Sequence, residues 1–117
     1  MIHLNTLSRD NRKRKFGFIE YNTETHFFTG KNYDKKVEAS FILSENDINI
    51  ILEHFKDKGW FILGNQVDDV KPNGFGSFYK DALNGSPKNT SHISSYLQHK
   101  DLIISRIHNG CLELKIK

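Results

Sequence analysis

The pattern of apolar and polar positions changes character near residue 44. Before that point, residues 16–21 and 25–29 are rich in aromatic and β-branched side chains, a composition typical of strands. The short polar link Asn22-Thr23-Glu24 between them predicts a β-hairpin. Residues 2–7 and 37–43 are two further strand candidates. In the second of these, one strand face would carry Val37, Ala39, Phe41 and Leu43.

From residue 44 onward the period becomes that of a helix. Four apolar residues recur at the spacing i, i+3, i+4, i+7, namely Ile48, Ile51, Leu52 and Phe55. Ser44 is the expected N-cap, with Asp47 three residues later as in a relative of the capping box. Gly59 is the expected residue just past the helix end. The pattern therefore predicts a helix over residues 44–58.

The remaining segments predict a short buried strand at 60–63 and two more helices. Residues 75–83 form an amphipathic pattern that stops at Gly85, and Gly74 and Gly76 are expected to permit a tight start of that helix. Residues 90–100 form another helix, whose apolar side carries Ile93, Tyr96 and Leu97.

The last segment, 102–117, predicts a hairpin closed by Asn109-Gly110, a dipeptide that suits a type I′ turn. That turn sets a register with three cross-strand pairs: His108 with Cys111, Ile107 with Leu112, and Arg106 with Glu113. The core face of the hairpin would carry Ile103, Ile107, Leu112, Leu114 and Ile116. The opposite face would carry Arg106, His108, Lys115 and Lys117.

From residue 44 to 117 the order helix, strand, helix, turn, helix, hairpin resembles the winged helix-turn-helix superfamily. The resemblance is carried by residues 90–103 and by the hairpin that follows them. It implies that the third helix binds DNA while the hairpin, the wing, contacts the flanking backbone. The predicted fold is α+β: a small N-terminal antiparallel β element (1–43) packed on a C-terminal winged helix (44–117), as one compact unit.

Composition narrows the class of protein. With 117 residues, 37% of them hydrophobic, the chain is expected to fold as one small domain. The single cysteine, Cys111, excludes an internal disulfide, and no apolar run reaches the length of a membrane span. The expected location is the cytoplasm.

Charge is distributed unevenly along the chain. Residues 1–43 carry eight Lys or Arg against five Asp or Glu, residues 44–85 carry four against seven, and residues 86–117 carry five against two. Two basic ends therefore flank an acidic middle. Since phosphate contacts supply most non-specific affinity for nucleic acid, the basic ends are the expected binding elements.

The third predicted helix offers short hydrogen-bonding side chains opposite its apolar side. The residues expected to face nucleic acid there and on the hairpin are Lys88, Asn89, Thr90, Ser91, His92, Ser95, Gln98, His99, Lys100 and Arg106. Among them, Gln98 and Asn89 are expected to read bases, while Lys88, Lys100 and Arg106 contact phosphate. The same pattern also fits a solvated helix face on which Thr90 or Ser91 is the N-cap.

The N-terminal aromatic hairpin suggests a second way of binding. Residues 15–19 and 25–28 resemble the two aromatic motifs of cold-shock domains, in which single-stranded bases stack on exposed rings. The resemblance implies stacking on Phe16, Phe18 and either Phe27 or Phe28, with phosphate bound by Lys13, Arg14 and Lys15. Alternatively, these aromatic residues pack a small sheet against the first helix.

No sharp catalytic motif is present, so no enzyme activity, cofactor or metal is expected. The six histidines lack metal-ligand spacing, although His92 and His99 lie two helical turns apart. A nuclease that uses a histidine pair stays open, and Asp68-Asp69 with Lys71 is a weaker hint of an acidic nuclease site.

The predicted function is therefore nucleic-acid binding with a regulatory role. Duplex DNA is the first choice of ligand, and single-stranded DNA or RNA is the second. The alternative is a small protein of the mobile-element type that binds and inhibits another protein, through acidic residues Asp57, Asp68, Asp69 and Asp81. The oligomeric state stays open, with a homodimer among the options.

Overall fold

The computed structural model describes residues 1–9, 12–66 and 71–117. The N-terminal third forms a four-stranded antiparallel sheet in the order β1-β2-β3-β4. Its strands are β1 (Ile2–Asn5), β2 (Lys15–Glu20), β3 (Glu24–Phe28) and β4 (Phe41–Ser44). The predicted hairpin is confirmed as β2–β3, closed by a hydrogen bond from Tyr21 N to Glu24 O of 2.8 Å.

The strand predicted at 37–43 is shorter than expected and starts at Phe41. Pairing with β3 begins with the hydrogen bond from Ser40 N to Phe27 O. Ahead of that bond, Lys36 has a left-handed φ of 54°, which is not an extended backbone conformation. Val37 lies outside the strand and is 87% exposed, so the predicted start of the strand at residue 37 is wrong, whereas Leu43 lies in β4 and is buried.

Helix α1 (Glu45–Phe55) confirms the predicted first helix, which ends slightly earlier than residue 58. Ser44 caps it: the side-chain oxygen of Ser44 accepts from Asp47 N at 3.0 Å, and Asp47 Oδ2 accepts from Ser44 N at 3.2 Å. Ile51 and Phe55 are buried, with Ile48 and Leu52 packed against them. The predicted apolar face is therefore the face that meets the core.

Two helices and a second sheet complete the chain. Its elements are β5 (Phe61–Ile62), α2 (Phe75–Leu83), a 3-10 turn (Pro87–Asn89), α3 (Thr90–His99), β6 (Ile103–His108) and β7 (Cys111–Ile116). Gly74 is the N-cap of α2, and the amide of Gly76 donates to Leu63 O at 2.9 Å. A Cβ at Gly76 would lie 1.9 Å from the carbonyl oxygen of Gly64, so the tight start of α2 requires glycine there.

The C-terminal hairpin has the predicted register throughout, including the pair Arg106–Glu113. Strand β5 pairs with β7, which gives an antiparallel sheet in the order β5-β7-β6. One part of the predicted core face is wrong: Ile107 is 57% exposed because it lies beside the turn, beyond the packed end of the hairpin.

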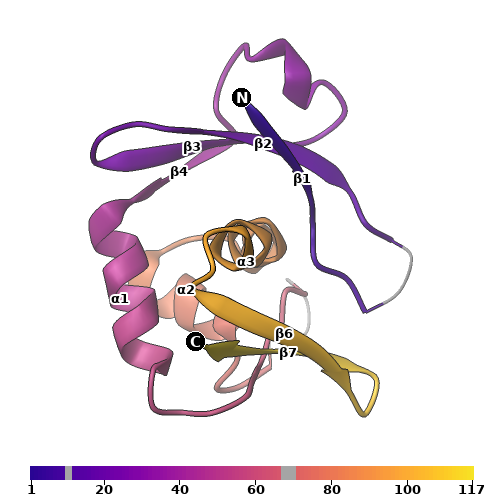
Figure 1. The fold of residues 1–117 in the computed structure, drawn as a ribbon, viewed down its shortest axis with the longest axis vertical. Helices are drawn as coiled ribbons and strands as arrows, with labels where there is room; N and C mark the ends of the chain where they lie inside the picture. The colour runs from indigo at the N-terminus through magenta and orange to yellow at the C-terminus, as the bar shows by residue number, and fades with distance from the viewer. Residues whose placement is uncertain (10–11, 67–70) are drawn as a thin grey trace.

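Helix α3 lies between the two sheets, with the four-stranded sheet on one side and the hairpin β6–β7 on the other (Figure 1). A single buried cluster contains Phe16, Phe18 and Phe27 of the first sheet together with residues of all three helices and the second sheet. The protein is thus a mixed α+β fold whose N-terminal sheet and C-terminal part share one core.

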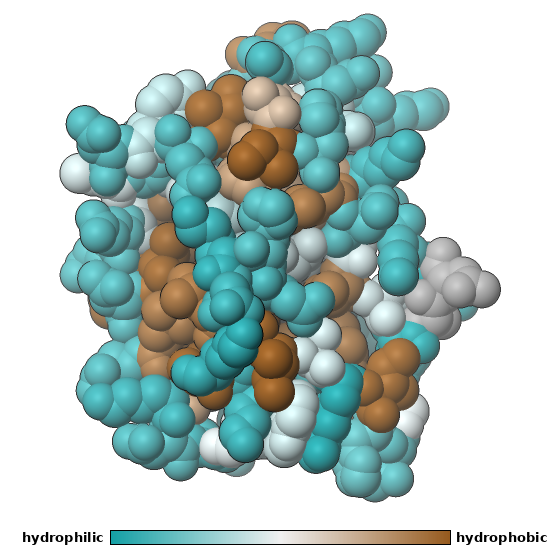
Figure 2. Space-filling model, in the orientation of Figure 1, coloured by the Kyte–Doolittle hydropathy of each residue, from teal (hydrophilic) through white to brown (hydrophobic). Residues whose placement is uncertain are grey.

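The surface seen in Figure 2 is mostly hydrophilic, with apolar residues showing between polar ones. Among the described residues, no helix is long and apolar enough to cross a membrane.

Candidate nucleic-acid interface

The face of α3 predicted to enter a DNA groove is largely buried. Thr90 has no exposed surface, and Ser91 and Ser95 are each only 7% exposed. The hydroxyl of Ser95 donates to Asn5 O of β1 at 2.6 Å, and that of Thr90 donates to Pro87 O at 2.6 Å. These hydroxyls bond to backbone carbonyls of the same protein, so their predicted role at an exposed face is wrong.

His92 also belongs to this packed junction. Its ring meets that of Phe16 edge-on at a centroid distance of 5.1 Å. Burial lowers the pKa of His92 to about 4, so the imidazole is neutral at neutral pH. A neutral ring packed on an aromatic side chain contributes to the core and offers no charge to a phosphate.

A polar contact fastens the exposed end of α3 to the sheet. Glu20 Oε2 accepts from the hydroxyl of Tyr96 at 2.9 Å and pairs with Lys100 Nζ at 3.0 Å. Burial works to raise the pKa of Glu20, but hydrogen bonds from Lys100 and Tyr96 outweigh it and hold that pKa below its ordinary value. Lys100, predicted to contact phosphate, is therefore engaged by a carboxylate within the protein.

The aromatic residues of β2 pack inward instead of forming a stacking platform. Phe16 and Phe18 are 0% and 1% exposed, and the ring of Phe18 meets that of Tyr96 at 4.8 Å. The predicted base stacking on Phe16 and Phe18 is wrong in this fold. The alternative of a packed sheet is right, although the sheet covers α3 instead of α1.

Separating the sheet from α3 would cost too much to be a binding step. Fully burying one phenylalanine is worth about 1.5–3 kcal/mol, so Phe16, Phe18 and Phe27 together contribute about 5–9 kcal/mol. The whole stability of a small domain is about 5–15 kcal/mol. Helix α3 is therefore a core helix in the folded protein, and separating it from the sheet would cost a large part of that stability.

Three predicted residues from distant parts of the chain do come together at the surface. Lys13, Gln98 and Arg106 line one groove of about 290 Å³ between the segment after β1, the end of α3 and the hairpin. The rest of the lining is Asn5, Thr6, Leu7, Ser8, Ser105, Ile107 and Leu112. Lys88 and Asn89 lie in the 3-10 turn, and they do not line the groove.

The segments just after β1 and just before β2 are held together by two hydrogen bonds. Thr6 N donates to Arg14 O at 2.9 Å, and Arg14 N donates back to the Thr6 hydroxyl at 3.0 Å. The side chains of Lys13, Arg14 and Lys15 are exposed at this point. The Thr6–Arg14 pair therefore fixes the backbone next to Lys13 at the edge of the groove.

On the opposite wall, hydrogen bonds orient the polar side chains. Ser105 donates to the side-chain oxygen of Gln98 at 2.5 Å. Because its oxygen is engaged, Gln98 has its two amide N–H groups left as donors. The guanidinium of Arg106 pairs with Glu113 Oε1 at 2.8 Å, which confirms the predicted cross-strand pair.

Sequence reasoning missed Trp60. The guanidinium carbon of Arg106 lies 4.1 Å from the centre of the Trp60 ring, and Lys115 Nζ lies 5.9 Å from it. The tryptophan marked the predicted strand at 60–63, but nothing local indicated that this strand would pair with β7 and so reach Arg106.

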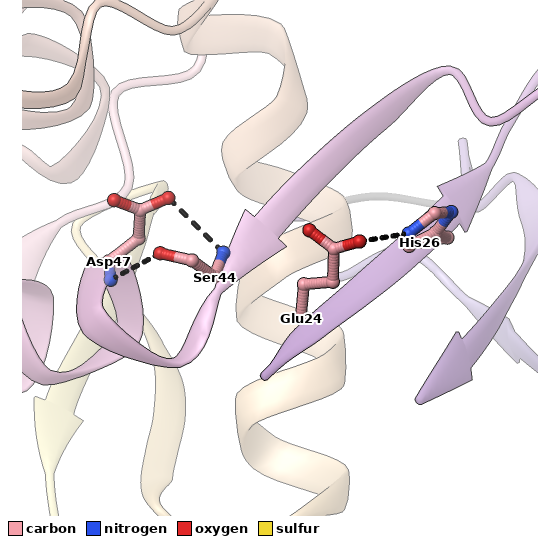
Figure 3. Close-up of polar contacts among 4 residues, drawn as sticks. All are labelled: Glu24, His26, Ser44 and Asp47. Atoms are coloured by element: carbon pink, nitrogen blue, oxygen red, sulfur yellow. Dashed lines mark hydrogen bonds and ion pairs between the residues drawn. The ribbon is translucent and has the colours of Figure 1, made fainter. Parts of the chain in front are cut away.

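The β2–β3 turn carries a second polar cluster with a histidine. His26 Nε2 lies 2.9 Å from Glu24 Oε1, and its ring meets that of Tyr21 at 4.7 Å. Figure 3 shows this pair beside the Ser44–Asp47 cap of α1. A nuclease of the kind considered above needs a pair of histidines, and this cluster contains only His26.

Metal and acidic-site hypotheses gain no support. Within residues 1–9, 12–66 and 71–117, no group of three His, Cys, Asp or Glu side chains is placed to hold a metal ion. His92 packs on Phe16 and His99 lies 6.0 Å from the ring of Phe18. Asp68 and Asp69 lie outside the described residues.

Comparison with known proteins gives no further guide to the class of protein. No family model, no curated protein and no solved structure matches this chain. The case for function therefore rests on the geometry of the groove and on the chemistry of its residues.

Proposed function

We propose that this protein binds nucleic acid, and that residues 44–117 form a winged helix-turn-helix in which the hairpin β6–β7 is the wing. The element order α1, β5, α2, α3, β6, β7 and the pairing of β5 with β7 support this arrangement. The binding surface is the groove between Lys13, the segment after β1 and the wing. It replaces the buried face of α3 as the contact with the ligand.

The observation that carries the proposal is the convergence of Lys13, Gln98 and Arg106 on one groove. A lysine, an amide and a guanidinium all donate hydrogen bonds, and two of them are cationic. Phosphodiester oxygens accept such bonds and carry the complementary charge. Arg14 and Lys15, which follow Lys13 in the chain and are exposed, extend the positive surface beyond the groove, as a backbone of several nucleotides requires.

The position of α3 also sets the mode of binding. Because Ser95 and His92, which were expected to face a duplex groove, are packed against β1 and β2, contacts with the sugar–phosphate backbone dominate. Binding of this kind has weak sequence preference and depends steeply on salt.

Binding measured over a series of salt concentrations tests the proposal. Fluorescence anisotropy with labelled duplex DNA, single-stranded DNA and RNA of equal length should show affinity that falls linearly on a log–log plot against salt. Lys13→Ala should weaken all three and lower the slope by about one phosphate contact. Lys80→Ala is the matched control, because Lys80 is an exposed lysine of α2 that does not line the groove.

Two results would overturn the proposal. One is the lack of binding to any of the three ligands at low salt, which would favour the protein-binding alternative. The other is an equal effect of Lys13→Ala and Lys80→Ala, which would mean that the net positive charge of the protein, and not the groove, attracts the ligand.

A further inference from the structure

The guanidinium of Arg106 is held on two sides. It lies over the Trp60 ring at 4.1 Å, and both its Nε and Nη2 contact Glu113 Oε1 at 2.8 Å. Glu113 belongs to the central strand of its sheet, and its side chain is only 16% exposed. Its carboxylate therefore holds the guanidinium of Arg106 in place. The side chain of Arg106 nevertheless remains 39% exposed.

The surroundings of Arg106 are suited to an anion. Side chains alternate between the two faces of a strand, so Ile104, Arg106 and His108 share the face of β6 that points away from the core. On β7 the same face carries Glu113 and Lys115, with Trp60 beside them. Two cations, a histidine and an indole thus face solvent around one carboxylate.

We propose that Arg106, held over Trp60, is a stacking platform for an unpaired base, so that the ligand is single-stranded nucleic acid. This inference rests on the proposed function and names its ligand class. Guanidinium planes and indole rings stack with exposed bases, and a guanidinium already fixed in place loses little freedom on binding. Bases inside a duplex are stacked on one another and cannot use this platform.

The groove and the platform fit one continuous strand. Arg106 lines the groove together with Lys13 and Gln98 and also covers Trp60, so this one side chain belongs to both the groove and the platform. The groove supplies affinity for any backbone, and the platform adds affinity only for a strand whose bases are free.

Trp60 provides a direct readout, because it is the only tryptophan of the chain. Titration with a single-stranded oligonucleotide should quench its fluorescence and show affinity about tenfold or more above that for a duplex of equal length. Heparin, a polyanion without bases, should compete with both ligands for the groove. Because it has no base to stack, its binding should not quench Trp60 as the single strand does.

Arg106→Lys is the discriminating variant, since it keeps the charge and removes the planar group. It should lose the preference for the single strand, so that the ratio of single-strand affinity to duplex affinity falls about tenfold, whatever it costs at the groove that the two ligands share. Trp60→Leu, followed by anisotropy, should lose the same preference while duplex and heparin binding change by no more than about twofold, because Trp60 does not line the groove. Thermal unfolding verifies that both variants are folded.

The outcomes separate the inference from the proposed function. If the wild-type protein binds single strand and duplex equally, or if Arg106→Lys and Trp60→Leu both keep the preference, the platform is wrong and the groove stands. If no polyanion binds at all, the proposed function fails and the platform fails with it.

Discussion

His92 illustrates how one side chain takes its chemistry from its surroundings. In the sequence it follows two hydroxyl residues and looks like a surface ligand of nucleic acid. In the fold it lies edge-on to Phe16 and near Phe41, and its Nδ1 is buried with no hydrogen-bond partner within the described part of the chain. Water that would solvate an imidazolium is excluded there, so the neutral form is favoured.

We predict that His92 makes the fold sensitive to acid. Its pKa is about 4 in the folded protein and near the ordinary 6.5 in the unfolded chain. The folded state thus binds fewer protons between these values, and stability present above pH 6.5 is lost as the pH falls toward 4. His92→Phe should reduce this loss by about 1–3 kcal/mol, measured by urea unfolding at pH 7 and pH 4.

The comparison with the variant isolates His92 from Glu20, whose lowered pKa acts in the same direction and is unchanged by the substitution. Equal losses of stability in the wild-type protein and His92→Phe would contradict the prediction.

At the scale of elements, α3 is the helix against which both sheets pack. Seven of its ten residues are buried, whereas α1 buries two of eleven. A helix buried on more than one side carries small polar residues where a neighbouring strand comes close. Ser95, whose hydroxyl bonds to β1, is such a residue.

This difference predicts unequal effects of the same substitution in the two helices. Leu97 of α3 is 1% exposed, so Leu97→Ala should cost about 2–5 kcal/mol through lost burial and a cavity. Leu52 of α1 is only half-buried, so Leu52→Ala should cost clearly less. Urea unfolding of the two variants under identical conditions gives the comparison, and a larger cost at Leu52 would contradict the central place of α3.

At the scale of the whole molecule, the single core implies one cooperative unit. Phe16 of the N-terminal sheet belongs to the same buried cluster as Leu114 of β7. The predicted boundary near residue 44 separates two patterns of sequence, yet the core extends across it.

We therefore predict that damage to the N-terminal sheet destabilises the far side of the molecule. Phe16→Ala should cost about 3–5 kcal/mol. The unfolding transition reported by the fluorescence of Trp60 should move together with that reported by far-ultraviolet circular dichroism. A Trp60 transition that stays in place while the circular dichroism changes would indicate two independent lobes.

The sequence alone determined the elements whose signals are local. Asn109-Gly110 fixed the hairpin and its register, because type I′ geometry requires positive φ at both positions, and the structure has φ of 51° and 74° there. Ser44 and Asp47 marked the start of α1, because their reciprocal hydrogen bonds involve residues only three apart.

Only the tertiary structure decided which surfaces remain outside. The polarity of Ser91 and Ser95 suggested exposure, but a small hydroxyl is readily buried when it bonds to a backbone carbonyl. Ser95 bonds to Asn5 O in this way, where β1 approaches α3. In the sequence, Phe16 and Phe18 are equally compatible with exposed rings that stack on bases and with rings packed in a core. Only the structure shows that α3 covers this face of the sheet. The groove of Lys13, Gln98 and Arg106 joins three distant segments, so its existence depends on long-range packing that no local pattern encodes.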